Sequence, residues 1–133
     1  MAVKFNVLMP ELSVVDLERS KYFYVEILGF CLEYERAEDR LACVSLGEAQ
    51  LLLEEINGHW ATGELAYPFG RGVNFQIAAP DVAKLGQALK SNGIPLFREV
   101  YEAAYRENDT VHRMRELLVQ DPDGYLLRFA QAL

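Results

Sequence analysis

Residues 120–129, with the sequence QDPDGYLLRF, combine a tight turn with an alternating strand. Pro122 presets a turn φ, Asp123 can bond nearby backbone, and Gly124 supplies a left-handed position without a Cβ clash. Because side chains alternate along a strand, Arg128 projects to the sheet face opposite its two apolar neighbours. The turn therefore predicts which face of the sheet carries this one charged side chain.

The composition is that of a single globular domain. The chain has 133 residues, of which 51% are hydrophobic and 25% charged, so one sizeable core is expected over residues 1–133. Thirteen Lys and Arg against twenty Asp and Glu give a net charge of -7, which repels nucleic acid and anionic membranes. We therefore expect a neutral or cationic small-molecule ligand, and neither nucleic acid nor a membrane as partner.

The cysteines and the N-terminus indicate a cytoplasmic protein. Cys31 and Cys43 are the only cysteines and form no Cys-x-x-Cys motif, so we expect both to be buried and reduced. No signal peptide is evident in the first ten residues, and no apolar run approaches the length of a membrane span.

The spacing of apolar residues predicts one arrangement of strands and helices that occurs twice. The first copy, module one at 4–56, is predicted as a strand at Lys4–Met9, a helix at Asp16–Leu28, and strands at Phe30–Glu35, Leu41–Leu46 and Ala49–Ile56. The second copy, module two at 72–131, is predicted as a strand at Gly72–Ala78, a helix from Asp81 to Asn92, and strands at Pro95–Tyr101, Arg113–Gln120 and Tyr125–Ala130. A linker at 57–71 joins the modules, and Glu102–Asp109 is predicted as a polar loop.

Helices on one face of the sheets leave the opposite, concave face free to hold a ligand. Alternation assigns to the helix-covered core Leu51, Leu53, Val73, Phe75, Ile77, Leu127 and Phe129. It assigns to the concave face Leu52, Glu54, Asn74, Gln76 and Arg128. The same pattern also suits polar residues that simply face solvent, and the sequence leaves this alternative open.

The chain resembles the vicinal oxygen chelate superfamily, which includes glyoxalase I, extradiol dioxygenases and bleomycin resistance proteins. The resemblance rests on the duplicated unit and on the motifs VDLERS at 15–20 with Phe23-Tyr24, LGF at 28–30 and DPDGY at 121–125. It implies an α+β fold in which two βαβββ modules form a curved mixed sheet with helices on the outer face.

In metalloenzymes of this superfamily, inward His and Glu side chains hold a divalent metal. The corresponding positions here are Met9, Asn74 and Arg128, with the fourth near Leu52 and Glu54 as the register alternative. A thioether, an amide and a fixed positive charge form a poor ligand set for such a metal. We therefore predict neither a metal nor another cofactor.

Other candidate groups lie outside this set. His59 and His112 could form a metal site only with help from Glu54 or Glu55, and loop histidines are usually solvated. The aromatic residues of the linker, Trp60, Tyr67 and Phe69, suit either packing over the sheet or a subunit, or the roof of a ligand cavity.

Arg128 likewise has two interpretations. An arginine shielded from water needs a partner, so it either pairs with Glu54 across the cup or contacts an anionic group of the ligand.

The resulting hypothesis is a metal-free small-molecule binding protein that resembles bleomycin resistance proteins, sequesters a compound such as an antibiotic, and works as a homodimer. No catalytic residue is assigned, and the predicted ligand-binding residues are Met9, Leu52, Glu54, Trp60, Asn74, Gln76 and Arg128. The alternative is a superfamily enzyme of the lyase, isomerase or dioxygenase type with absent or displaced metal ligands. A third possibility is a protein-interaction role, which a large exposed apolar patch would indicate.

Overall fold

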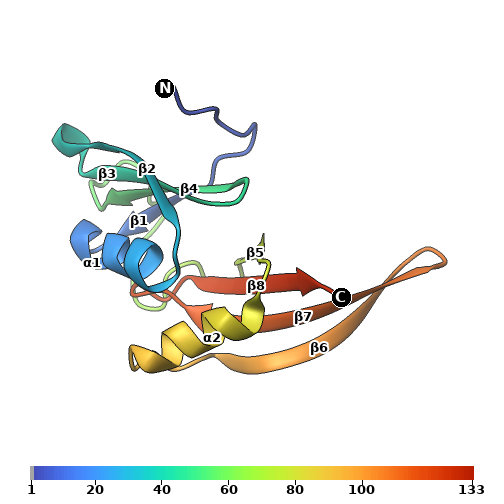
Figure 1. Cartoon of the computed structure of the whole chain (residues 1–133). Coiled ribbons are helices and arrows are strands. Elements are labelled where there is room, and N and C mark those ends of the chain that lie inside the picture. Colours follow the sequence, from blue (N-terminus) through green and yellow to red (C-terminus); the bar gives the residue numbers. More distant parts are fainter. Residues whose placement is uncertain (1) are drawn as a thin grey trace. The chain divides into compact units, whose positions relative to one another are not determined.

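The computed structural model describes residues 2–133, which divide into two compact units, one ending at Phe69 and the other running from Gly70 to Leu133. Figure 1 shows a helix packed beside a sheet in each unit. None of the helices within residues 2–133 is long and apolar enough to cross a bilayer.

The first unit begins with a strand and a helix, as predicted, although its first strand lies later in the chain. Asp16 caps the helix, because its Oδ1 accepts a hydrogen bond from the backbone N–H of Arg19 at 3.2 Å. The helix continues as a wider π-helical segment, and the chain leaves it at Gly29, which has a φ of 82°. The elements are β1 (Glu11–Val14), α1 (Leu17–Lys21), η1 (Tyr22–Ile27), β2 (Cys31–Arg36), η2 (Ala37–Asp39), β3 (Leu41–Leu46) and β4 (Ala49–Glu55).

The second unit repeats this order. Its helix starts at a cap of the same kind, in which Asp81 Oδ1 accepts from the N–H of Lys84 at 3.1 Å. The elements are β5 (Asn74–Ala78), α2 (Val82–Ser91), β6 (Arg98–Glu107), β7 (Thr110–Gln120) and β8 (Leu126–Ala132).

Each unit contains one four-stranded mixed sheet. The strand order is β1-β4-β3-β2 in the first sheet and β5-β8-β7-β6 in the second. In both sheets the first strand pairs in parallel with the last one along the chain, and the other pairs are antiparallel. The equal topology confirms the α+β fold class and the predicted duplication.

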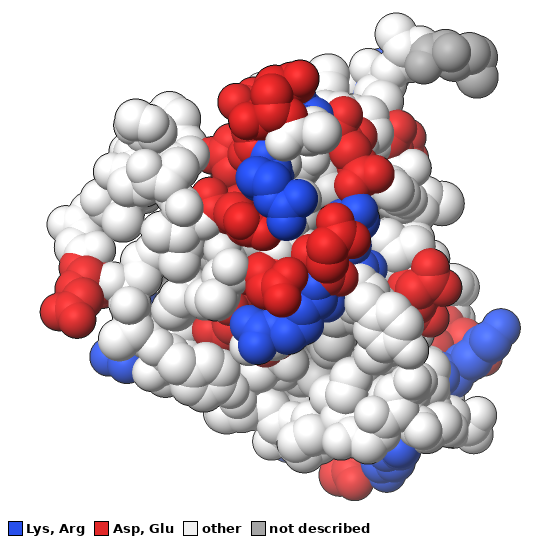
Figure 2. All heavy atoms as spheres, turned by 90° about the vertical axis from the view of Figure 1, so that its left-hand side faces the viewer, with Lys and Arg blue, Asp and Glu red and all other residues white. Residues whose placement is uncertain are grey.

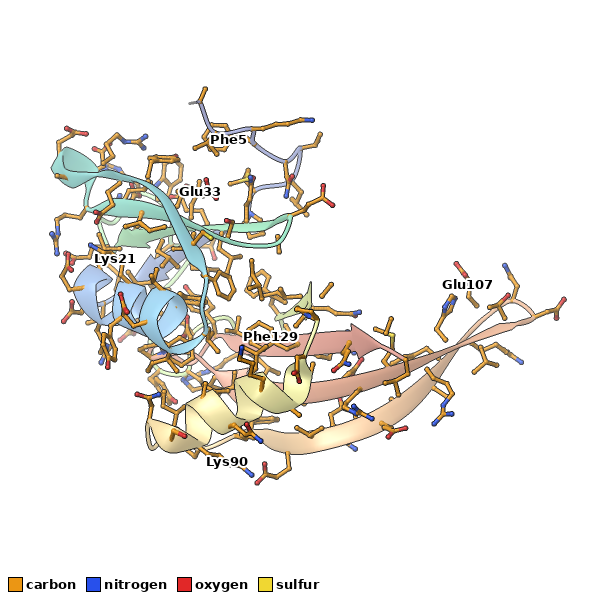
Figure 3. The ribbon with its side chains drawn as sticks, viewed as in Figure 1. Phe5, Lys21, Glu33, Lys90, Glu107 and Phe129 are labelled. Atoms are coloured by element: carbon orange, nitrogen blue, oxygen red, sulfur yellow. The ribbon has the colours of Figure 1, made fainter. Side chains whose placement is uncertain are left out.

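The core of the second unit lies between α2 and its sheet. A Cβ added to Gly86 of α2 would lie 3.5 Å from Leu117 of β7, so this face of β7 packs on the helix. Phe129, which Figure 3 labels on β8, shares that face because it pairs with Leu117 and is fully buried. Side chains alternate along a strand, so Arg128, the neighbour of Phe129, faces away from the helix.

Most of the predicted core is confirmed. Leu51, Leu53, Ile77, Leu127 and Phe129 are buried, and Phe75 is half-buried. The assignment of Val73 is wrong, because β5 begins only at Asn74 and the Val73 side chain is 52% exposed.

One predicted strand and one predicted loop are wrong. Lys4–Met9 is not a strand, because Glu11–Val14 is the segment that pairs in parallel with β4. Lys4 and Asn6 instead bond to the side-chain amide of Gln50, whose Oε1 accepts from the N–H of Asn6 and whose Nε2 donates to the carbonyl of Lys4. Glu102–Asp109 is not a loop, because β6 continues to Glu107 and pairs with β7. Its polar residues reflect a hairpin exposed on both faces, and Figure 1 shows this hairpin extending past β8.

The cysteines differ from each other. Cys43 is buried as predicted, and burial raises the pKa of its thiol, with Glu33 adding a smaller electrostatic contribution. The prediction for Cys31 is wrong: it begins β2 at the edge of the sheet, where one side of the strand has no neighbour, and it is exposed.

Surface charges of both signs are interspersed. Figure 2 shows acidic and basic side chains side by side on one face of the molecule. In the first unit, Lys21, labelled on α1 in Figure 3, pairs with both Glu18 and Glu35. Such exposed pairs contribute little to stability.

Candidate functional site

The turn before β8 is closed by a buried carboxylate. Asp121 Oδ1 accepts from the N–H groups of Asp123 at 2.9 Å and Tyr125 at 3.0 Å, so a carboxylate that was not singled out in the sequence bonds the backbone of this turn. An aspartate side chain bonds best to the backbone two residues onward, which favours the first position of this turn. Gly124 has the expected left-handed conformation, with a φ of 96°.

The strand register brings two of the predicted site residues together. Gln76 of β5 is the pairing partner of Arg128 of β8, and Arg128 Nη2 donates to Gln76 Oε1 at 2.8 Å. Asn74 lies on the same face, opposite Leu126. Asn74, Gln76 and Arg128 therefore share one face of this sheet, away from α2, as the alternation predicted.

A buried carboxylate that was not predicted lies beside Arg128. Glu116 of β7 is 0% exposed, and its Oε1 accepts from the hydroxyl groups of Tyr101 at 2.5 Å and Tyr105 at 2.9 Å. The same oxygen lies 3.9 Å from Arg128 Nη1. In the sequence, Glu116 is recognisable only as an acidic residue beside the apolar run Leu117–Val119. Its hydrogen-bond partners come from another strand, and the sequence does not reveal how the two strands pair.

The environment of this carboxylate keeps a tyrosine protonated. Burial, followed by the hydrogen bond and negative charge of Glu116, raises the pKa of Tyr101 to about 12. The hydroxyl therefore remains a donor to Glu116 even near pH 11, where an exposed tyrosine has lost its proton.

Two hollows line this face of the second unit. The first, here called the Arg128 pocket, has a volume of about 350 Å³ and is lined by Gln76, Tyr105, His112, Met114 and Arg128. The second has a volume of about 450 Å³ and is lined by Ala78, Ala79, Pro80, Met114, Ala130, Gln131 and Ala132. Met114 lines both hollows, and the walls of the second are mainly small and apolar.

His112 is engaged at the outer end of this face. Its Nε2 lies 2.9 Å from Oε1 of Glu107, which Figure 3 labels near the tip of the β6–β7 hairpin. His59 belongs to the first unit, where its backbone N–H donates to Asn57 Oδ1 at 2.8 Å.

The first unit carries its own polar cluster on the face of β4 away from the core. Glu54 is 7% exposed, and its Oε1 accepts from Asn57 Nδ2 at 2.8 Å and from Trp60 Nε1 at 2.9 Å. Leu52 shares this face of β4. Burial and then the nearby Glu54 carboxylate raise the pKa of Glu11.

The remaining predicted residues lie in connecting segments. Met9 precedes β1 and is half-buried, while the Trp60 ring is 67% exposed although its Nε1 is bonded to Glu54. Tyr67 is exposed and Phe69 is buried. Arg128 pairs with Glu116 within its own unit; a further ion pair with Glu54, which belongs to the other unit, stays a prediction.

The donor set does not fit a divalent metal. Arg128 carries a fixed positive charge at one ligand position implied by the resemblance, and Gln76 and Glu116 hold its guanidinium on that face. Within residues 2–133, no group of three or more His, Cys, Asp or Glu side chains is arranged to hold a metal ion.

The fold and the motifs agree with a match to a known family. The model of the Glyoxalase/Bleomycin resistance protein/Dioxygenase superfamily matches residues 4–129. The chain belongs to this superfamily. A probable lactoylglutathione lyase from Vibrio parahaemolyticus is 31% identical to it over 132 residues, covering 95% of this chain and 90% of the relative.

Two further similarities are consistent with this membership. A probable lactoylglutathione lyase from Synechocystis sp. is 29% identical over 126 residues, covering 90% of each chain. The crystal structure of a glyoxalase/bleomycin resistance protein/dioxygenase from Alicyclobacillus acidocaldarius has a TM-score of 0.65 and 23% identity, and it covers 96% of this chain and 92% of its own. This structural similarity shows the shared fold.

Proposed function

We propose that this superfamily member is a metal-free small-molecule binding protein whose main ligand site is the Arg128 pocket. The observation that carries the proposal is the guanidinium of Arg128, which lies at a position where the superfamily resemblance implies a metal ligand. A permanent cation there opposes a divalent metal and instead offers hydrogen-bond donors to a ligand.

The other predicted ligand-binding residues complete the proposal. Asn74 and Gln76 share the face of Arg128. In the first unit, Leu52 and Glu54 share a face of β4, and Trp60 donates to Glu54. Together with Met9, these residues are proposed as ligand contacts in a homodimer that resembles bleomycin resistance proteins.

Metal content and ligand binding test the proposal together. Purified protein, dialysed without chelator, is analysed by inductively coupled plasma mass spectrometry and screened by thermal shift against an antibiotic and metabolite library. We expect less than about 0.1 metal per chain and at least one compound whose stabilisation grows with concentration and is lost in Arg128→Ala. Stoichiometric bound metal would contradict the proposal, as would hits that Arg128→Ala leaves unchanged.

The second candidate function is a superfamily enzyme of the lyase type. It is favoured by the two relatives named probable lactoylglutathione lyase. Glu11 and Glu54 add two interacting carboxyl groups on the first unit. Production of lactoylglutathione from methylglyoxal and glutathione, measured with and without added Ni²⁺ or Zn²⁺, separates the candidates. Turnover that Glu54→Gln abolishes would favour the enzyme.

A further inference from the structure

The positive charge of the Arg128 pocket is countered at short range. Glu116 Oε1 lies 3.9 Å from Arg128 Nη1, and the Glu116 side chain is 0% exposed while that of Arg128 is 27% exposed. Water screens a buried charge weakly, so the carboxylate cancels much of the field that Arg128 would otherwise present. The pocket therefore has little net charge despite the arginine in its wall.

The exposed amide of Gln76 offers a donor to a ligand. The amide oxygen of Gln76 is occupied by Arg128 Nη2, which leaves the amide nitrogen of Gln76 without an acceptor among residues 2–133. Arg128 Nε, a donor, and Glu116 Oε2, an acceptor, are both buried without a partner within that range, so neither is open to a ligand. Glu116 Oε1 is already used by Tyr101 and Tyr105. A complementary ligand thus presents an acceptor oxygen.

The second hollow, which shares Met114 with the Arg128 pocket, is suited to an apolar group. Met114 lines both the Arg128 pocket and the adjoining hollow, whose walls include Ala78, Ala130 and Ala132. A thioether adapts to irregular apolar shapes, and small alanine side chains leave space above the sheet.

We propose that Glu116 sets the charge preference of the Arg128 pocket, so that this pocket takes an uncharged ligand with a carbonyl oxygen toward Gln76 and Arg128 and an apolar part on Met114. This inference rests on the proposed function, since it requires that the pocket binds a ligand. It adds the chemical class of that ligand and a residue that determines specificity.

Three probes with the same ring test the charge preference: benzamide is neutral, benzoate anionic and benzamidinium cationic. Their binding is followed by the ¹³C-methyl signal of Met114 in methionine-labelled protein at pH 8, assigned with Met114→Leu. In the wild type, benzamide binds more tightly than either ion. In Glu116→Gln, whose amide oxygen still accepts from the tyrosines, benzoate gains about tenfold and becomes the preferred probe.

A matched variant controls for total charge. Glu102→Gln removes a negative charge from β6, where Glu102 pairs with Arg113 and Arg115 and lies in the register opposite to that of Tyr101. We expect it to leave the order of the three probes unchanged. Equal effects of Glu102→Gln and Glu116→Gln would overturn the inference.

A second variant changes Arg128 instead of Glu116, so the inference can still be tested if Glu116→Gln does not fold. In Arg128→Gln the charge of the Glu116 carboxylate has no counter-ion, so benzamidinium binds more tightly than it does to the wild type. In the double variant that carries both Arg128→Gln and Glu116→Gln, the preference for benzamide is restored. A purely structural role of Glu116 would not produce this restoration.

The outcomes separate the two proposals. If benzoate is the preferred probe of the wild type, or if neither variant changes the order, the inference fails while binding in the pocket stands. If no probe shifts the Met114 signal in any variant, both the inference and the proposed function of this pocket fail.

Discussion

Replacing Tyr101 with Phe removes one hydroxyl donor from a fully buried carboxylate. The hydroxyl lies 2.5 Å from Glu116 Oε1, and a hydrogen bond to a charged group contributes about 1.5–3 kcal/mol to the free energy of unfolding. Raising the pKa of Tyr101 from 10.0 to about 12 corresponds to about 2.7 kcal/mol of stability lost between neutral and strongly alkaline pH before solvent screening, although burial, its largest cause, adds no stability to the protonated hydroxyl. Since the ring is half-buried, screening reduces this to roughly 1–2 kcal/mol. We therefore expect Tyr101→Phe to lose about 1.5–2 kcal/mol at pH 8.

The pH dependence has a definite sign. The pKa is higher in the folded state, so this contribution is fully present below the unfolded pKa near 10.0 and disappears as pH rises through about 12. The stability difference between wild type and Tyr101→Phe should accordingly shrink between about pH 10 and about pH 12.

Urea unfolding followed by far-ultraviolet circular dichroism at about pH 8, 10, 11 and 12 measures this difference. Tyr22→Phe is the control, because Tyr22 is exposed and belongs to the other unit, and it should change stability by less than about 0.5 kcal/mol. The reasoning is refuted if Tyr101→Phe has wild-type stability at pH 8, or if its stability stays parallel to that of the wild type across the whole range.

Three further substitutions test the turn, a close contact and an ion pair. Asp121→Ala leaves two backbone N–H groups without their acceptor and should cost about 2–4 kcal/mol in urea unfolding. Gly70→Ala should cost at least about 1–2 kcal/mol in the same assay, because Gly70 has a φ of 71° and an added Cβ would lie 2.7 Å from the Tyr125 ring. The Arg40 guanidinium and then the Leu17 N–H lower the pKa of Glu55, so its contribution is present above pH 4.5 and lost as pH falls. Glu55→Gln should therefore lower the melting temperature at pH 7 and flatten its decline toward pH 3.

Each of these predictions has its own control. Gly63→Ala should be tolerated, because nothing lies within 4 Å of the added Cβ; equal losses from Gly63→Ala and Gly70→Ala would contradict the steric argument. Wild-type stability of Asp121→Ala would show that the turn does not depend on its carboxylate. An unchanged acid transition in Glu55→Gln would show that the bond to Arg40 contributes nothing.

The sequence was informative where structure depends on neighbours along the chain. Asp16 and Asp81 each precede a helix and cap it, and Gly29 and Gly124 occupy left-handed positions, because capping and turn conformation are local effects. The order of strands and helices in both units followed from apolar spacing. The strand prediction for Lys4–Met9 was wrong because strand formation depends on a partner far away in the chain. The alternation of this segment suits a strand, but Glu11–Val14 is the segment that pairs with β4.

Within the candidate site, the turn at 121–124 and the alternation of β8 determined by themselves that Arg128 faces away from the core. Its companions were decided only by tertiary structure. Gln76 and Glu116 reach it through parallel pairing with β5 and antiparallel pairing with β7, and Tyr101 and Tyr105 reach Glu116 from β6. Strand register depends on contacts between residues far apart in sequence, so the short-range pattern could place Arg128 on a face but could not reveal the buried carboxylate that offsets its charge.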